Sequence, residues 1–243
     1  MTQGGIKLGK IIAVVSGKGG TGKTSFTANV GLALAALGCH TLCLDCDITL
    51  RNLDLALGLS DRALMDFTDV IAGRCTLEDA VVQHPKYPKL HLLTAPLSAR
   101  PVPIAPEQMK ALLDRIRQTY DYCLIDAPAG LGMGFHLSSD YADRAVVVTN
   151  TDASSLRDAQ RTVMELDRFP SGALHLVVNR VRKKLLRQLH ATIDDAIDKA
   201  GLPLLGVVPE DDALPLCMNR GVPILLADGQ SCLLYTSDAA DDS

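Results

Sequence analysis

A glycine-rich segment near the N-terminus has the spacing that most clearly predicts chemistry. Residues 17–24 read Gly-Lys-Gly-Gly-Thr-Gly-Lys-Thr and match the pattern G-x-x-x-x-G-K-[ST]. In such a loop, backbone N–H groups surround phosphate oxygens, and glycines let the backbone approach them closely. The sequence therefore predicts a nucleoside triphosphate site formed by Gly17, Lys18, Gly19, Gly20, Thr21, Gly22, Lys23, Thr24 and the adjacent Ser25.

Three side chains of this loop have separate expected roles. Lys23 is expected to reach the β- and γ-phosphates, and Thr24 is expected to bind Mg²⁺ through its hydroxyl. Lys18 is a second cation directly after the first glycine, which an ordinary phosphate loop does not need. It could neutralise charge on a nucleotide held by a second subunit, or it could be a solvated surface lysine. Residue type alone favours the surface lysine.

Three aspartates stand where apolar strands are expected to end. Asp126 closes the run Tyr-Cys-Leu-Ile-Asp, a position from which an aspartate holds Mg²⁺ directly or through water. Asp45 and Asp47 leave another strand two residues apart, so they lie on the same side if the strand continues. Taken alone, both could be exposed turn residues. Beside a phosphate loop, we expect them to belong to its site.

Alternating strands and helices are needed to position these groups. Short β-branched runs predict buried parallel strands, and leucines and alanines at helical spacing predict the helices between them. The expected strands are 10–15, 41–46, 90–93, 122–125, 145–149, 174–178 and 204–208, and the expected helices are 24–37, 107–119, 154–168 and 183–200. This order predicts an α/β fold with a doubly wound, mostly parallel sheet flanked by helices.

Composition limits the partners and the number of domains. With 243 residues, 47% of them hydrophobic, the chain is long enough to bury a sizeable core. A net charge of −4 argues against nucleic-acid binding through bulk charge.

The two cysteines of Cys43-Leu-Asp-Cys46 should point to opposite faces of a strand, which disfavours a shared metal. The basic run 180–187 predicts a solvated helix face, with contact to acidic lipid or DNA as the alternative.

The last twelve residues differ in character from the rest. We expect one P-loop ATPase domain over residues 1–231 and a disordered tail over residues 232–243. The run from Cys232 to Asp241 resembles one reading frame of a sequencing-library adapter, so the tail is predicted to be non-native. A natural acidic tail is the alternative, since the segment holds three Asp and no Lys or Arg.

Several segments resemble the MinD/ParA family of ATPases. Residues 18–24 are similar to its deviant Walker A motif, and residues 44–54, which include Leu-Arg-Asn-Leu-Asp, resemble its MinD branch. The likeness continues in residues 70–77, 126–130, 154–158, 177–181, 208–211 and 219–224, and spans roughly residues 10 to 228. It implies a SIMIBI-type P-loop NTPase fold that binds ATP and Mg²⁺ and hydrolyses ATP to ADP and phosphate.

The resemblance also implies roles for individual residues. Asp45 would lie in the second coordination shell of Mg²⁺, Asp47 would position the attacking water, and Lys18 would cross to the partner's phosphates in an ATP-dependent homodimer. Asn179 and Arg180, together with the loop Pro209, Glu210 and Asp211, would lie around adenine, although all five could be plain loop residues. The chain departs from the family at Gly132, where MinD proteins usually have a glutamate.

The family further implies a switch that positions the cell-division site. Its expected partners are a MinC-like division inhibitor, a MinE- or DivIVA-type topological factor, and an anionic membrane at the cytoplasmic face of the inner membrane. The membrane contact in this family is a C-terminal amphipathic helix, which we expect to be missing from this chain. The alternatives are a flagellar-number, cargo- or DNA-positioning ParA-like ATPase, and a metabolic ligase or small-molecule kinase with the same loop.

Overall fold

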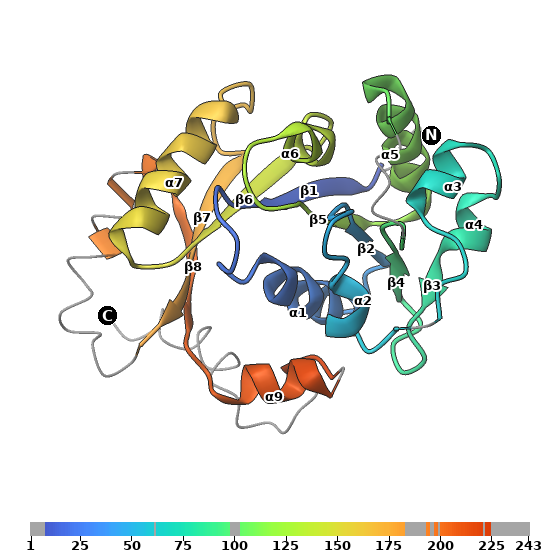
Figure 1. Ribbon diagram of the computed structural model, residues 1–243, viewed down its shortest axis with the longest axis horizontal. Coiled ribbons are helices and arrows are strands. Elements are labelled where there is room, and N and C mark those ends of the chain that lie inside the picture. The colour runs from blue at the N-terminus through green and yellow to red at the C-terminus, as the bar shows by residue number, and fades with distance from the viewer. Residues whose placement is uncertain are drawn as a thin grey trace, which may run out of the picture.

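One sheet organises the part of the chain that the structure describes. The computed structural model describes residues 8–60, 62–97, 103–182, 193–194, 197–198, 200–220 and 222–224. The eight strands run in the order β3-β4-β2-β5-β1-β6-β7-β8 (Figure 1). They are β1 (Lys10–Val15), β2 (Thr41–Asp45), β3 (Val82–Gln83), β4 (Leu90–Leu93), β5 (Tyr122–Asp126), β6 (Arg144–Thr149), β7 (Leu174–Val181) and β8 (Leu204–Pro209).

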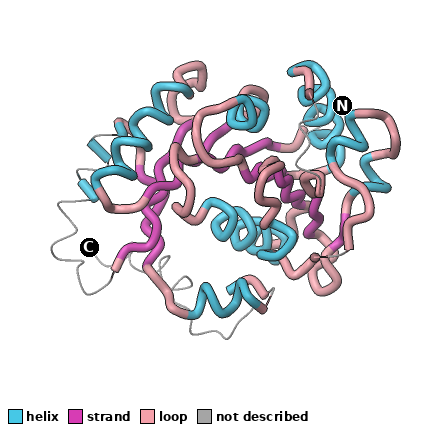
Figure 2. The backbone as a smooth tube through the Cα atoms, in the orientation of Figure 1, coloured by secondary structure: helices cyan, strands magenta, loops and turns pink. Residues whose placement is uncertain are grey.

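All neighbouring pairs are parallel except β3 with β4. Parallel strands need crossover connections, and the helices that provide them lie on both faces of the sheet (Figure 2). This arrangement confirms the predicted doubly wound, mostly parallel sheet. The strands expected from apolar runs are all present, with ends that differ from the expected ones by at most three residues.

The helices form two layers. In Figure 1, α1 (Lys23–Ala36), α2 (Leu53–Ala56) and α9 (Ala213–Asn219) lie on one side of the sheet, and α5 (Pro106–Thr119), α6 (Met133–Ser139) and α7 (Ala153–Glu165) lie on the other. The short helices α3 (Phe67–Ile71) and α4 (Leu77–Ala80) pack beside α5. The expected helix 183–200 and the tail 232–243 fall largely or wholly outside the described residues.

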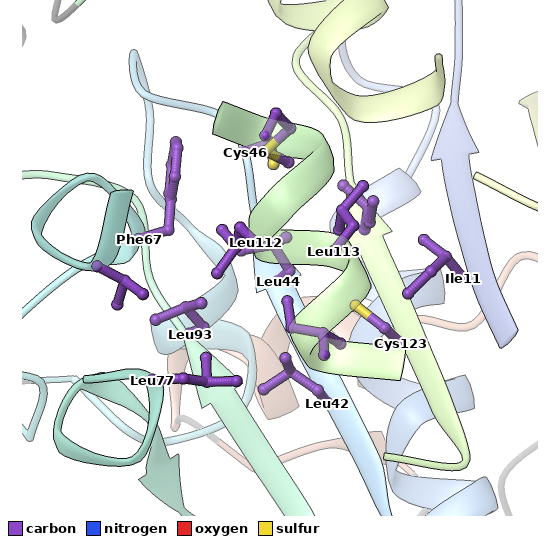
Figure 3. Close-up of a cluster of buried hydrophobic side chains, with 14 of the residues drawn as sticks. Ile11, Leu42, Leu44, Cys46, Phe67, Leu77, Leu93, Leu112, Leu113 and Cys123 are labelled. Atoms are coloured by element: carbon purple, nitrogen blue, oxygen red, sulfur yellow. The ribbon is translucent and has the colours of Figure 1, made fainter. Parts of the chain in front are cut away.

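The core is built from strand residues that alternate between the two layers. Ile11, Leu42 and Leu44 belong to an apolar cluster under α5, which Figure 3 shows with Cys123 and Leu113 among its members. Val14 lies three positions after Ile11, so its side chain points to the opposite face of the sheet and packs with Phe26 of α1. Because both faces of the central strands are covered, these strands read as continuous apolar runs in the sequence.

The strand register determines where the functional loops meet. Val14 of β1 and Asp45 of β2 both lie opposite Asp126 of β5. The loops that follow these three strands therefore leave the sheet side by side at its carboxyl edge. This is the edge at which open α/β sheets bind ligands.

Candidate nucleotide site

The glycine-rich loop joins β1 to α1, as its motif predicts. Gly20 and Gly22 have φ angles of +78° and +94°, a region that residues with a Cβ rarely adopt. A Cβ at Gly22 would also lie 2.2 Å from the side-chain nitrogen of Asn179. The loop thus needs glycine at Gly22 for both its backbone angle and its close packing.

Lys23 lies at the start of α1 with most of its side chain buried. Its ammonium group donates a hydrogen bond to the Ser16 hydroxyl at 2.8 Å. Burial lowers the pKa of Lys23, and the carboxylates of Asp126 and Asp47 oppose that shift. A cation held at a helix N-terminus beside open backbone N–H groups is the arrangement that binds phosphate.

Asp126 and Thr24 form the part of the site that fits a divalent cation. The Thr24 hydroxyl donates to Oδ2 of Asp126 at 2.6 Å, and Asp126 is 1% exposed. Its other oxygen, Oδ1, is buried and has no hydrogen-bond partner among the described residues. Burial raises the pKa of Asp126 to about 6. A hydroxyl and a carboxylate together with substrate phosphates are a ligand set that suits Mg²⁺.

Asp45 has a different environment from Asp126. Its two oxygens accept backbone N–H groups from Asp47 at 2.9 Å and Leu53 at 3.1 Å. Burial, and then the nearby charge of Asp126, raises the pKa of Asp45 to about 7. Asp45 therefore accepts hydrogen bonds at both ends of the segment that carries Asp47. This geometry fits a residue that supports a metal site without binding the metal directly.

Asp47 lies at the open side of this carboxylate group. One of its oxygens, Oδ1, accepts hydrogen bonds from the backbone and hydroxyl of Thr49 and from the backbone of Leu50. These bonds fix the turn after β2, so the side chain lines the cleft in a defined orientation. The role of Asp47 toward water stays a prediction.

A cleft of about 560 Å³ joins the loop to these carboxylates. Its volume lies within the range of small-molecule sites, roughly 300–1,000 Å³. The loops after β1, β2 and β5, the end of β7 and the end of α9 all contribute to its walls. The lining residues are Gly19, Gly20, Gly22, Lys23, Thr24, Ser25, Asp47, Leu50, Asn52, Leu55, Ala127, Ala129, Arg180, Met218 and Asn219.

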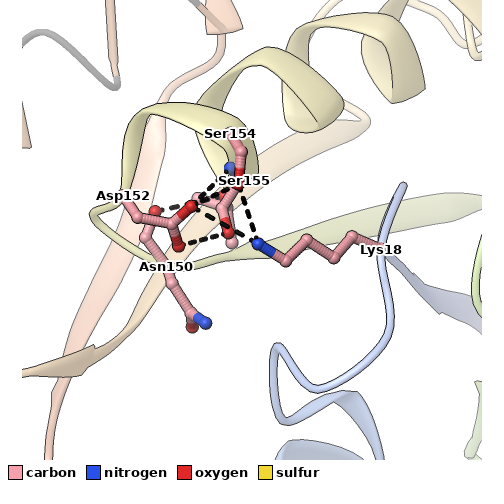
Figure 4. Close-up of polar contacts among 6 residues, drawn as sticks. Lys18, Asn150, Asp152, Ser154 and Ser155 are labelled. Carbon is pink, nitrogen blue, oxygen red and sulfur yellow. Dashed lines mark hydrogen bonds and ion pairs between the residues drawn. The ribbon is translucent and has the colours of Figure 1, made fainter.

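Lys18 lies beside the first turn of α7 of its own chain. Its ammonium group donates to the Ser154 hydroxyl at 2.9 Å and lies 3.4 Å from the Asp152 carboxylate (Figure 4). Asp152 caps α7 by accepting the Ser155 backbone N–H at 2.9 Å. Hydrogen bonds from Ser154 and Ser155 hold the pKa of Asp152 well below its usual range, so this carboxylate is a stable partner for a cation.

The residues expected around adenine separate into two groups. Arg180 lines the cleft, with a φ of +56°. Asn179 is buried beneath the loop, where its amide donates to the Thr21 carbonyl at 2.7 Å. Pro209, Glu210 and Asp211 are absent from the described lining of the cleft: Glu210 pairs with Arg182 at 2.9 Å, and Asp211 accepts the Ala213 backbone N–H. The α9 residues Met218 and Asn219 do line the cleft, and the expected contacts of the five residues with adenine stay a prediction.

Sequence reasoning assigned no role to several of these contacts. Ser16 directly precedes the motif, and its position next to the loop was the available signal. Asn52 and Asn219 lie within segments that resemble the family, although the likeness assigns them no role. Met218 and the partners of Lys18 have no local signal, because only the fold brings them to the site.

The cysteines are free thiols within the described residues. Cys43 packs on the α1 side of the sheet and Cys46 on the α5 side, which confirms their predicted opposite faces. Among the residues that the structure describes, no group of three or more His, Cys, Asp or Glu side chains is placed to hold a metal.

Comparison with known proteins identifies the family. The model of the CobQ/CobB/MinD/ParA nucleotide binding domain matches residues 12–224. The chain belongs to this family. It is 40% identical over 220 residues to the putative septum site-determining protein MinD of Guillardia theta, an alignment that covers 90% of this chain and 82% of that protein.

Solved structures of this nucleotide-binding family are also similar in three dimensions. The MinC:MinD cell division protein complex of Aquifex aeolicus matches with a TM-score of 0.82 and 37% identity, covering 89% of this chain and 88% of that one. The septum site-determining protein MinD of Pyrococcus horikoshii, complexed with Mg-ADP, matches with a TM-score of 0.80 and 29% identity, covering 97% of each chain. Within the described part of this chain, no helix is long and apolar enough to span a membrane.

Proposed function

We propose that this chain is an Mg²⁺-dependent ATPase whose dimerisation switch positions the cell-division site. One observation carries the proposal: Asp126 has a buried oxygen with no hydrogen-bond partner among the described residues, and the same carboxylate is bonded to Thr24 and lies close enough to Lys23 for their charges to interact. Such an oxygen is costly unless a ligand satisfies it. A similar solved structure holds Mg-ADP, which supports the same ligands here.

The nucleotide would be held by the glycine-rich loop and by α1. The backbone of residues 17–24 would bind the phosphates, and Lys23 would lie against the β- and γ-phosphates. Thr24 and Asp126 would hold Mg²⁺, whose role is to neutralise the charge that develops on the phosphates. Arg180, Met218 and Asn219 would lie beside the base, because they form the cleft wall contributed by β7 and α9.

The attacking water would be positioned by Asp47. Asp45 accepts N–H groups on both sides of the turn that carries Asp47, so it keeps that turn in register with the end of β2. No glutamate follows Asp126, the place where many phosphate-loop ATPases keep a water-orienting carboxylate. Asp47 would therefore supply this carboxylate.

The second lysine would couple hydrolysis to dimerisation. In the single chain, Lys18 is held by Asp152 and Ser154 at the start of α7, at the same edge of the sheet as the nucleotide cleft. In a dimer of two ATP-bound chains, we propose that Lys18 leaves these partners and contacts the phosphates of the opposite subunit. A cation supplied in this way stabilises charge in the transition state, so hydrolysis would be slow in a monomer.

The partners follow from the same relatives. A MinC-like division inhibitor is supported by the similar MinC:MinD complex. We also propose a MinE- or DivIVA-type factor that stimulates hydrolysis, and action at the cytoplasmic face of the inner membrane. ATP should bind more tightly than GTP if the cleft wall beside Arg180 contacts the base and distinguishes adenine from guanine.

Phosphate release measured against protein concentration tests the proposal. With ATP and Mg²⁺, the rate per chain should rise with concentration, and Lys23→Ala should remove ATP binding. Lys18→Ala should bind ATP normally, but its hydrolysis rate per chain should not increase with protein concentration. Lys86→Ala, which removes an exposed lysine far along the chain, should behave as wild type. Equal concentration dependence in Lys18→Ala and wild type would contradict the dimer mechanism. Phosphate found on a small acceptor instead of free in solution would favour a kinase.

A further inference from the structure

A second cavity, of about 550 Å³, lies apart from the phosphate loop. Its walls come from α3, α5 and α6 and from the segments that follow β2 and β5. Phe67, Met109 and Phe135 form part of these walls, and each is at most 3% exposed. Figure 3 shows Cys46 and Phe67 at one end of the apolar cluster beneath α5. The cavity thus has a buried floor of core side chains, and exposed residues such as Met133 form its rim.

The chemistry of these walls selects an uncharged ligand. No Lys, Arg, Asp, Glu or His is among the described residues that line the cavity. The Thr49 hydroxyl is already bonded to Asp47. A charged ligand would lose its hydration here without gaining a partner, whereas an apolar ligand would lose little.

The size of the cavity favours a small molecule over empty space. Its volume lies in the range of ligand sites, roughly 300–1,000 Å³. Protein interiors are otherwise close-packed, and cavities much larger than a water molecule are few. An apolar cavity of roughly 150 Å³ is already large enough to bind benzene. The buried part of the wall, which includes Phe67, Met109 and Phe135, is held by core packing, so a ligand would not have to order these side chains.

Gly132 lies in the wall of this cavity. Its φ of −81° suits any residue, and a Cβ placed there would meet no atom within 4 Å. Glycine is therefore not required by the backbone at this position. It leaves open space in the cavity wall, where a large side chain would lie next to the ligand.

The cavity adjoins the nucleotide cleft. Ala129 lines both, and the segment 46–49 contributes Cys46, Ile48 and Thr49 to the cavity while its Asp47 lines the cleft. A ligand in the cavity would thus touch the two segments that leave β2 and β5 toward the nucleotide.

We propose that this cavity is a binding site for an uncharged, apolar small molecule. The site takes its ligand between α3, α5 and α6 and needs neither nucleotide nor a second subunit to form. Its occupant contacts the backbone that positions Asp47 and the segment after Asp126. The site is therefore placed to influence the nucleotide cleft without belonging to it.

Titration with N-phenylnaphthylamine, an uncharged apolar fluorophore, tests this site on the full chain without nucleotide. Fluorescence should saturate at one probe per chain. Gly132→Leu should weaken binding by about tenfold or more, since the new side chain takes up cavity space. Gly206→Leu is the matched control: it adds the same side chain in β8, where a Cβ also meets nothing within 4 Å, and it should bind the probe as wild type.

The outcomes separate this site from the proposed ATPase. Circular dichroism checks that both variants are folded. Absence of saturable binding, or equal affinity in Gly132→Leu and wild type, would overturn the proposal and would leave the ATPase measurements unaffected. A chain that bound the probe but failed to hydrolyse ATP would retain this site and lose the proposed function.

Discussion

Replacing Asp45 with asparagine should remove most of the pH dependence of stability between pH 5 and pH 8. Asp45 is fully buried at the end of β2. Burial, followed by the charge of Asp126, raises its pKa from 3.8 to about 7. The folded chain therefore keeps this proton over a pH range in which the unfolded chain has released it. Folding is favoured at the lower pH, and the free energy of unfolding falls as the pH rises through this range.

The magnitude follows from the two pKa values. One pKa unit corresponds to about 1.4 kcal/mol, and Asp45 holds its extra proton over about two of the three pH units between pH 5 and pH 8, so it contributes about 3 kcal/mol. Asp126, whose pKa is raised to about 6, contributes about 1 kcal/mol with the same sign. Stability should therefore fall mainly between pH 5 and pH 7 and level off above the folded pKa.

Urea unfolding followed by circular dichroism at four pH values, without nucleotide or Mg²⁺, measures this slope. Asp45→Asn should be less stable than wild type at pH 5 by about 1–2 kcal/mol, because its amide accepts only one of the N–H groups of Asp47 and Leu53. Its stability should then fall by only about 1 kcal/mol up to pH 8, the contribution of Asp126. Asp114→Asn changes an exposed aspartate on α5 and should keep the wild-type slope. A wild-type slope in Asp45→Asn would refute the reasoning.

Two further substitutions test the packing of α1 against β2 and the support of the phosphate loop. Gly31→Ala should lower the free energy of unfolding by about 1–3 kcal/mol, because its Cβ would lie 2.3 Å from the Cys43 sulfur. Cys43→Ala in the same chain should restore part of the loss in urea unfolding, and a purely additive double variant would contradict the clash. Asn179→Ala removes the hydrogen bond to the Thr21 carbonyl. It should weaken binding of a fluorescent ATP analogue by about tenfold, the equivalent of one buried hydrogen bond, and unchanged affinity would count against this support.

The sequence predicted the loop and the strands well, because their signals are local. A phosphate loop needs its glycines and its lysine within eight residues, and a buried parallel strand needs a continuous apolar run. The strand β3 and the helices α2, α3, α4, α6 and α9 were not predicted. Helices of four to seven residues are too short to show helical periodicity, although Asp66 and Thr76 do form capping boxes at the starts of α3 and α4.

The candidate site was only partly visible for the same reason. Asp45 and Asp126 were placed together correctly, since both close apolar strands and parallel strands end at one edge of a sheet. The base-side residues stay a prediction. Pro209, Glu210 and Asp211 were expected beside adenine, and the described lining of the cleft includes Arg180, Met218 and Asn219 but not these three. Nothing local indicates how far a loop after the last strand extends across the cleft.

By itself, the sequence determined that a triphosphate loop joins a buried strand to a helix, and that carboxylates close two other strands. Only the tertiary structure decided which strands are neighbours, that Lys18 meets Asp152 and Ser154 across more than 130 residues of chain, and that a cavity opens beside Gly132. The physical reason is that backbone conformation and apolar periodicity act over a few residues. Side-chain partners and empty volumes instead depend on the packing of segments that the chain brings together only when it folds.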